Sequence, residues 1–490
     1  MKMFRIKLLW KPVENLKVLL GYSVTNNESG DDTVEYATWP KHYYNRANIK
    51  AYEGTVSRVS TLNLEYTINE NWSIKSLTGQ YLSDYTYIQD LDLRPKDYGF
   101  WDEKEKGNTF TQELKLVYAS KHVRAVFGFF YTKIKRDAND GIVNVPGGFL
   151  ESSLDAFNIV AQINTLKKQN IENKAIFGEV EYDLSEYWTL LAGIRYDSES
   201  LENESAIIGK ITDPGLLPPS FIPGIEALIN SQTKHETKNS AFLTKLGLRY
   251  HISEHEDLGL NYKEGYRPGG SDLNPFTQMT YEYNPEYTDT VEFSYRFKSA
   301  NKKTTFNTNI FYTKWKDMQV FVQSPGNIHN TYIDNSGSST LYGAELSASH
   351  YFSDTFNVFL TAGYVHTKFD NYVSYGQDYS GNQFAFAPEI TVSIGSKYYF
   401  TDNWCISGDL NYQSESYSSP SNTSETKIEA YTVFNAQLGY ETDTWSVFLY
   451  GRNLGNERYA TQYYLGSTGT REFVKMGKPR FVGLRCNVNF

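Results

Sequence analysis

Cysteine is almost absent from this chain. The only two, Cys405 and Cys486, are too few for a disulfide scaffold, and neither has the Cys-x-x-Cys or Cys/His spacing that builds a zinc site. We therefore expect no structural metal and treat both cysteines as ordinary packing residues.

Long apolar runs are missing as well. No stretch approaches the run of about 18 apolar residues that a membrane-spanning helix requires, and the mean hydropathy is -0.52. These features exclude spanning helices. They leave a spanning β-barrel possible, because only alternate residues of such a barrel face lipid.

The chain also has no excess of positive charge. Its 47 lysines and arginines stand against 57 aspartates and glutamates, which gives a formal net charge of -10. A nucleic-acid-binding face requires clustered basic residues. We therefore expect no nucleic-acid partner.

Recognisable catalytic motifs are absent too. The sequence contains no His-Glu-x-x-His, no Gly-x-Ser-x-Gly and no phosphate-binding glycine loop, and its eight histidines form no ligand cluster. His251 and His255 flank a predicted turn, where solvated histidines are commoner than metal ligands. We expect no enzymatic activity, no catalytic residue, no protein-bound metal and no cofactor.

Tyrosine, in contrast, is abundant: the chain has 40 tyrosines, 29 phenylalanines and 8 tryptophans. The tyrosine ring is apolar and its hydroxyl is polar, so the residue suits an interface between hydrocarbon and water. This composition favours a protein that lies at a membrane surface or within a membrane.

Apolar and polar residues alternate along most of the chain. Near the C-terminus the apolar residues Trp404, Ile406, Leu410 and Tyr412 alternate with polar ones, and residues 434–440 repeat the pattern. A period of two predicts strands with one apolar and one polar face. Since a soluble β-sandwich also alternates, this pattern alone leaves open whether lipid or a second sheet covers the apolar face.

The connections between predicted strands alternate in length. Short ones cover residues 11–15, 69–71, 185–187, 353–355, 401–403 and 442–444. Long ones cover residues 26–51, 89–107, 135–167, 199–234, 264–284, 321–337, 368–383 and 453–478. Tight periplasmic turns at one end and long extracellular loops at the other are typical of outer-membrane barrels.

Five short turns share a further pattern, in which an acidic turn residue precedes a large aromatic residue. The aromatic residues are Trp72, Trp188, Phe356, Trp404 and Trp445. Acidic turns suit periplasmic water, and aromatic rings suit the headgroup level. We therefore predict an aromatic girdle at the periplasmic end.

The pattern gives about 19 strands over residues 1–490, with the first and the last running in the same direction. Single-chain bacterial barrels normally contain an even number of strands. An odd remainder predicts that an odd number of strands, about three, is absent from the front of the barrel. The predicted fold is all-β: a transmembrane antiparallel barrel of the 22-strand type that forms a single domain.

Several segments resemble, in order, motifs of TonB-dependent outer-membrane receptors of the ferric-siderophore type. They are Gly265-Tyr266-Arg267-Pro268-Gly269-Gly270, followed by Pro285-Glu286; Tyr342-Gly343-Ala344-Glu345-Leu346; Asn453-Leu454-Gly455-Asn456-Glu457-Arg458-Tyr459; and the closing segment 477–490. Each motif is weak alone, and their order and spacing make the resemblance specific. It implies a location in the bacterial outer membrane, in contact with lipid and lipopolysaccharide.

The closing segment carries a second implication of the resemblance. Val482, Leu484, Val488 and Phe490 alternate with other residues and end the chain on an aromatic ring. Such an ending resembles the signal that the barrel assembly machinery reads during membrane insertion, so these four residues are expected to form that signal.

The beginning of the chain departs from the family pattern. The family carries a signal peptide, a box that contacts TonB and a plug inside the barrel, whereas residues 1–10 already alternate like a strand within a barrel. We therefore expect contact with TonB only through an N-terminal region that this sequence lacks.

The resemblance further implies uptake of a ferric siderophore, whose own oxygens hold the iron, so the protein needs no metal-ligand motif. Aromatic rings and arginines in the long loops would bind the chelator. The candidates are Trp39, His42, Tyr43, Tyr44, Trp101, Arg267, Tyr281, Tyr283, His329, Tyr332, Tyr463, Tyr464 and Arg471.

Three alternatives stay open at this point. The same scaffold would serve haem, cobalamin or carbohydrate uptake, and a haem receptor would present an outer-loop histidine such as His42 or His329. A passive porin would have fewer strands and an inward-folded loop. A soluble all-β adhesin would not require short turns at one end only.

Overall fold

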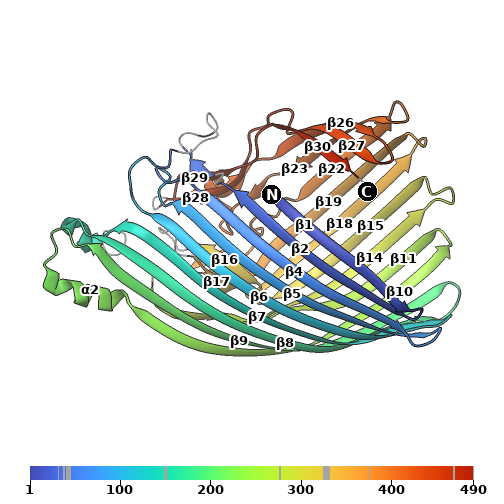
Figure 1. The fold of residues 1–490 in the computed structure, drawn as a ribbon, viewed down its shortest axis with the longest axis horizontal. Helices are drawn as coiled ribbons and strands as arrows, with labels where there is room; N and C mark the ends of the chain where they lie inside the picture. Colours follow the sequence, from blue (N-terminus) through green and yellow to red (C-terminus); the bar gives the residue numbers. More distant parts are fainter. Residues whose placement is uncertain are drawn as a thin grey trace.

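The computed structural model describes residues 1–30, 33–36, 39, 46–147, 152–274, 277–323, 331–374, 376–466 and 469–488. A 19-stranded antiparallel sheet dominates it and forms the curved, inclined wall seen in Figure 1. The fold is therefore all-β, and the predicted strand number is confirmed.

The strands of this wall pair in the order of the chain. They are β1 (Lys2–Val13), β2 (Leu16–Ser29), β4 (Tyr52–Thr67), β5 (Trp72–Asp90), β6 (Phe100–Ala119), β7 (Val123–Pro146), β8 (Val160–Asp183), β9 (Trp188–Asp213), β10 (Ser231–Ser253), β11 (Glu256–Arg267), β14 (Glu286–Lys298), β15 (Thr304–Lys316), β18 (Ser338–Tyr351), β19 (Phe356–Asn371), β22 (Ile390–Tyr399), β23 (Trp404–Gln413), β26 (Tyr431–Glu441), β27 (Trp445–Arg452) and β30 (Phe481–Val488).

Smaller elements lie between these strands on the loop side. They are β3 (Thr33–Glu35), β28 (Ala460–Leu465) and β29 (Arg471–Met476), which form one sheet, and the pairs β12 (Gly270–Leu273) with β13 (Thr280–Tyr283), β16 (Gln319–Gln323) with β17 (Thr331–Asn335), β20 (Val373–Ser374) with β21 (Gln377–Asp378), and β24 (Ser416–Tyr417) with β25 (Lys427–Ile428). Helical turns are η2 (Ser152–Phe157), η3 (Pro219–Phe221), α2 (Ile222–Ile229) and η4 (Ser424–Thr426). None of the helices in the described ranges is long and apolar enough to span a membrane.

The register turns the apolar residues outward. In one cross-strand row Leu260 pairs with Phe293, and Phe293 pairs with Ile310. These three side chains are 50%, 42% and 55% exposed. A continuous apolar surface of this kind is costly in water and favourable in lipid, so the exposed belt marks the face toward the bilayer.

The predicted aromatic girdle lies at the short-turn ends of the strands. Trp72 packs on Tyr118 at a centroid distance of 4.7 Å, and Trp188 packs on Tyr250 at 4.6 Å. Three more contacts, Trp404–Tyr440, Tyr440–Trp445 and Phe356–Tyr398, repeat the arrangement. In each case a ring after a turn packs against a ring from a neighbouring strand, in stacked, tilted or edge-on geometry.

Three of the predicted long loops are wrong in extent, because most of residues 89–107, 135–167 and 199–234 is strand. In the first, β5 continues to Asp90 and β6 begins at Phe100. In the other two, β7 continues to Pro146, β8 begins at Val160, β9 continues to Asp213 and β10 begins at Ser231. β9 and β10 pair without a register shift from Trp188, which lies opposite Tyr250, to Ile207, which lies opposite Ser231. Parts of these extensions, such as residues 135–141 and 231–240, lack large apolar side chains, so the hairpins continue there by backbone hydrogen bonds without an apolar alternation that a sequence could reveal. Farther out, Ile163 and Ile207 are buried against the loop residue Leu273.

The best-buried apolar clusters lie in the loop layer. One joins Val320, Phe369, Tyr372 and Phe384, and another joins Leu91, Ile142, Val145 and Ala161. The extracellular end of the barrel is therefore packed into ordered structure, and candidate binding residues are held by that packing.

Candidate functional site

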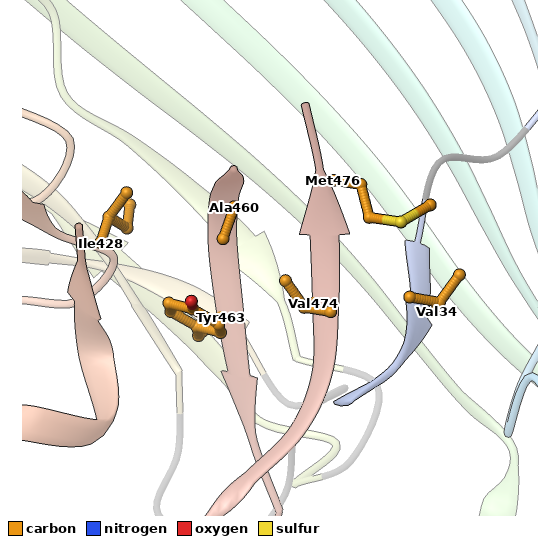
Figure 2. Packing of buried hydrophobic residues seen from close by; sticks show 6 residues of the cluster. All are labelled: Val34, Ile428, Ala460, Tyr463, Val474 and Met476. Carbon is orange, nitrogen blue, oxygen red and sulfur yellow. The ribbon is translucent and has the colours of Figure 1, made fainter. Parts of the chain in front are cut away.

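The sheet of β3, β28 and β29 caps one side of the extracellular mouth. Figure 2 shows its core, which joins Val34, Val474 and Tyr463 with Ile428, Ala460 and Met476. Val34 and Val474 are 1% and 0% exposed. Because β3 follows β2 while β29 precedes β30, the cap joins residues near the two ends of the chain.

Arg471 forms the polar centre of this cap. Its guanidinium carbon lies 3.9 Å from the centroid of the Tyr463 ring. It donates hydrogen bonds to the carbonyls of Glu425 at 2.8 Å, Ser424 at 2.7 Å and Lys427 at 3.1 Å. Trp39 also packs on Tyr463. Three candidates thus come together, and Arg471 already uses its donors within the protein.

Burial changes the acidity of the same tyrosine. It raises the pKa of Tyr463, and the nearby Arg471 cation partly offsets that rise. The phenol therefore stays neutral at physiological pH. A neutral ring under a guanidinium suits a cation–π contact, which favours a packing role for this pair.

A cavity of about 640 Å³ lies between the cap and the upper ends of β4, β5 and β6. Two candidates, Trp101 and Tyr464, line it together with Tyr87 and Phe473. Its charged lining residues are Lys475, Lys478, Glu53 and Asp90. Rings beside charged groups suit a ligand with both apolar and ionic parts.

Asp90 fixes the wall of this cavity. Its carboxylate is 2% exposed and accepts backbone N–H groups from Asn48 at 3.1 Å, Ile49 at 3.2 Å, Asp92 at 3.0 Å and Leu93 at 2.8 Å. One buried acceptor thereby joins two loops. An ion pair of 3.4 Å between Arg94 and Glu472 fastens the same region to β29.

Asp92, next to this anchor, holds a proton more tightly than usual. Burial, with help from the adjacent Asp90, raises the pKa of Asp92 to about 6. The Asp92 carboxyl therefore gains its negative charge as the pH rises through about 6.

A second aromatic group lies on the hairpin of β12 and β13, which packs against the inner face of β8, β9 and β10. Lys167 pairs with Asp272 at 2.9 Å, and the Asn203 amide donates to the Ser271 carbonyl at 2.8 Å. On this hairpin Tyr281 lies 6.5 Å from Tyr283 between ring centroids, and Tyr332 meets Tyr281 edge-on at 5.9 Å.

Tyr281 and Tyr283 are neutral over the physiological range, because burial raises the pKa of both phenols. The structure thus brings together three candidates that lie far apart in sequence. They are separate from the cavity next to the cap.

A family model described as "TonB dependent receptor-like, beta-barrel" matches residues 9–454. The chain belongs to this family. As a barrel of this family the receptor lies in the bacterial outer membrane, and its exposed apolar belt faces lipid.

Curated relatives of the receptor are distant. It is 21% identical over 346 residues to the pesticin receptor of Yersinia pestis, covering 65% of this chain and 44% of the relative. It is 21% identical over 477 residues to the catecholate siderophore receptor Fiu of Escherichia coli O157:H7, covering 90% of this chain and 60% of the relative. The receptor sequence thus spans roughly half the length of these relatives.

Solved structures share the fold of the receptor. The ferric yersiniabactin uptake receptor FyuA from Yersinia pestis superposes with a TM-score of 0.80 at 17% identity, covering 100% of this chain and 70% of that one. The ferric-catecholate import receptor Fiu from K12 E. coli superposes with a TM-score of 0.72 at 15% identity, covering 100% and 74%. At these identities the likeness establishes architecture.

Arg267 of the receptor lies at the end of β11 and is engaged with the next strand. Its guanidinium pairs with Glu286 at 2.9 Å, and Glu286 also accepts the Gln319 backbone N–H at 2.6 Å. This contact joins the two halves of the Gly-Tyr-Arg and Pro-Glu motif. Arg267 therefore positions the loop between β11 and β14, and its side chain remains 54% exposed.

The closing strand of the receptor has the predicted orientation. Val482, Leu484 and Val488 are 58%, 66% and 59% exposed on the outward face of β30. Phe490 lies outside the described residues, as do His42, Tyr43, Tyr44 and His329. The insertion signal and the haem alternative therefore stay predictions.

Sequence reasoning missed several residues of the receptor mouth. Tyr36 packs on Trp39 and Tyr463 in the cap, while Tyr87 and Lys475 line the cavity. Tyr87 lies in β5, outside the predicted loops. Lys475 lies within the predicted loop 453–478, but the candidates there were restricted to aromatic rings and arginines. In the described ranges no three His, Cys, Asp or Glu side chains gather to hold a metal ion.

Proposed function

We propose that this barrel belongs to a receptor that imports a ferric siderophore across the outer membrane with energy supplied through TonB. The support comes from the family match and from relatives whose names describe siderophore receptors. The structural observation on which this proposal mainly depends is the cavity of about 640 Å³ at the extracellular mouth.

The lining of this cavity suits the proposed ligand. Trp101 and Tyr464 would cover the flat aromatic parts of a chelator, and Lys475 and Lys478 would attract its anionic oxygens. The iron would remain coordinated by the chelator, so the protein would supply no metal ligands.

The test uses iron-starved cells that make no siderophore and express the receptor. They receive iron-55 bound either to a catecholate or to yersiniabactin, and uptake is measured with and without TonB. The proposal expects TonB-dependent uptake of at least one complex. Import of neither complex, or equal import without TonB, would overturn it.

A binding measurement tests the cavity itself. Trp101→Ala with Tyr464→Ala is expected to weaken surface binding of the imported complex about tenfold to a hundredfold, because two buried ring contacts are lost. Tyr182→Ala removes a ring from the outward face of β8 and serves as the matched control. Equal affinity of the double variant and the control would place the binding site elsewhere.

A further inference from the structure

The outward face of β7 changes in chemistry along the strand. Because side chains alternate between the two faces, its outward residues are Phe127, Phe129, Tyr131, Lys133 and Lys135 in order. Phe127 and Phe129 are 49% and 42% exposed and belong to the apolar belt. The face therefore passes from apolar rings through an amphipathic tyrosine to two lysines, the order expected where hydrocarbon gives way to lipid headgroups.

The strands on either side repeat this order. In β8 the outward residue Ile176 is 61% exposed, and Lys174 is the next outward residue toward the mouth. In β6 the outward residue Phe110 lies opposite Lys133 of β7, and Lys106 lies farther toward the mouth on the same face. Lysines of three adjacent strands thus stand together directly above the apolar belt.

We call the outward lysines of these three strands the basic patch. They are Lys104, Lys106, Lys133, Lys135, Lys168 and Lys174. The same face of these segments carries fewer carboxylates, namely Asp102, Asp137 and Glu172. Asp102 lies 2.9 Å from Lys104, and Glu172 lies 3.8 Å from Lys133 and 3.6 Å from Lys174. Two of the carboxylates are therefore already engaged within the patch.

The other lysines of the patch, Lys106, Lys135 and Lys168, are exposed. None of these three takes part in an ion pair among the residues that the structure describes. Asp137 lies opposite Lys106 on one side and Lys168 on the other, so a single carboxylate faces two of them.

The carboxylates that border the patch have cations of their own. On β5, Asp84 pairs with Arg58 at 2.8 Å. On β9, Glu202 and Glu204 share Lys234 at 2.5 Å and 2.6 Å. The neighbouring strands therefore leave the positive charge of the patch uncompensated.

We propose that the basic patch binds a phosphorylated lipid of the outer leaflet. The uncompensated lysines hold its phosphate groups, and its acyl chains lie on the outward apolar residues of β6, β7 and β8 beneath them. This inference is independent of the proposed import function. It assigns the lipid one position around the barrel.

The chemistry of the surface selects an amphiphile. An ammonium group binds phosphate as a compact point charge, and each lysine near a membrane surface adds to the attraction of anionic lipid. Phe129 and Ile176, directly below the lysines, offer exposed apolar surface that only a ligand with hydrocarbon chains would cover. A soluble polyanion would use the charges alone, so the two kinds of ligand can be told apart.

The test titrates lipopolysaccharide, a phosphorylated outer-leaflet lipid, into receptor that has been purified from outer membranes in detergent and stripped of lipid. Lys106→Gln with Lys135→Gln is expected to weaken binding about tenfold to thirtyfold, because two phosphate contacts are lost. The matched control is Lys314→Gln with Lys316→Gln, which removes two exposed lysines from the outward face of β15. Lys314 lies opposite Asp289 of β14, and we expect this control to bind like the wild type. Heat-dependent gel migration checks that both variants are folded.

Two further arms identify the ligand. Lipopolysaccharide whose phosphates have been removed should bind the wild-type receptor as weakly as the patch variant binds the intact lipid. Inorganic phosphate should displace the lipid no better than sodium chloride of equal ionic strength. Equal binding by the patch variant and the control, undiminished binding of the dephosphorylated lipid, or displacement specific to inorganic phosphate would each overturn the assignment.

Discussion

Arg471 shows how a residue type typical of ligand binding can serve packing instead. Its donors reach three backbone carbonyls, and its charge lies over Tyr463. Lysine keeps the charge but lacks the planar array of donors. The residue therefore decides how firmly the cap of β3, β28 and β29 is attached.

We predict that Arg471→Lys loosens this cap by about 1–3 kcal/mol, because buried carbonyls lose their donors. Hydrogen exchange of residues 424–428 and 460–476 should accelerate about tenfold or more. Arg480→Lys, on an exposed side chain, is the control. If the Arg471→Lys variant exchanged these backbone hydrogens at the wild-type rate, the guanidinium would not be what holds the cap in place.

Asp92 gives a pH-dependent prediction. Its pKa is raised to about 6 in the folded loop, so the folded loop favours the neutral acid, and this stabilisation is lost as pH rises through about 6. The wild-type loop should therefore exchange backbone hydrogens faster at pH 8 than at pH 5, after correction for intrinsic rates.

Asp92→Asn is expected to remove most of this difference. The amide cannot ionise, and its oxygen can still accept the Arg94 backbone N–H that Asp92 accepts at 3.2 Å. Hydrogen exchange of residues 91–99, measured by mass spectrometry across pH 5 to 8, checks the expectation. A variant that keeps the wild-type pH profile would assign the titration to another group.

At the scale of elements, the hairpin of β12 and β13 depends on contacts with the wall behind it. Leu273 is buried against Ile163 and Ile207, and the pair Lys167–Asp272 lies beside them. Since β12 and β13 form only a short two-stranded sheet, docking on β8, β9 and β10 holds it in place.

We predict that Asp272→Asn destabilises the docked hairpin by about 1–2 kcal/mol, because Lys167 loses its charged partner while partly buried. Lys167→Met in the same chain should recover part of the loss. Hydrogen exchange of residues 270–283 in the two single variants and the double variant gives the coupling energy. Additive effects of the two substitutions would show that the pair does not hold the hairpin.

At the scale of the whole molecule, the two faces of the wall face different solvents. Adjacent residues of β15 make this testable, since Ile310 points outward and is 55% exposed while Asn309 points into the lumen. We predict that Ile310→Arg destabilises the barrel in lipid vesicles by about 2–4 kcal/mol, whereas Asn309→Arg has a small effect. Urea unfolding with heat-dependent gel migration measures both, and similar costs would contradict a lipid-facing belt.

The sequence by itself determined the strand pattern, the short turns, the girdle and the outward face of β30, because these depend on neighbours along the chain and on alternation within a strand. It overestimated the loops at 89–107, 135–167 and 199–234, where backbone pairing continues through stretches with little apolar alternation. Only the tertiary structure decided which candidates meet. Tyr36 and Arg471 contact each other across 435 positions, and Lys167 meets Asp272 across 105 positions. Such contacts depend on how strands pair around the barrel, which local periodicity does not specify.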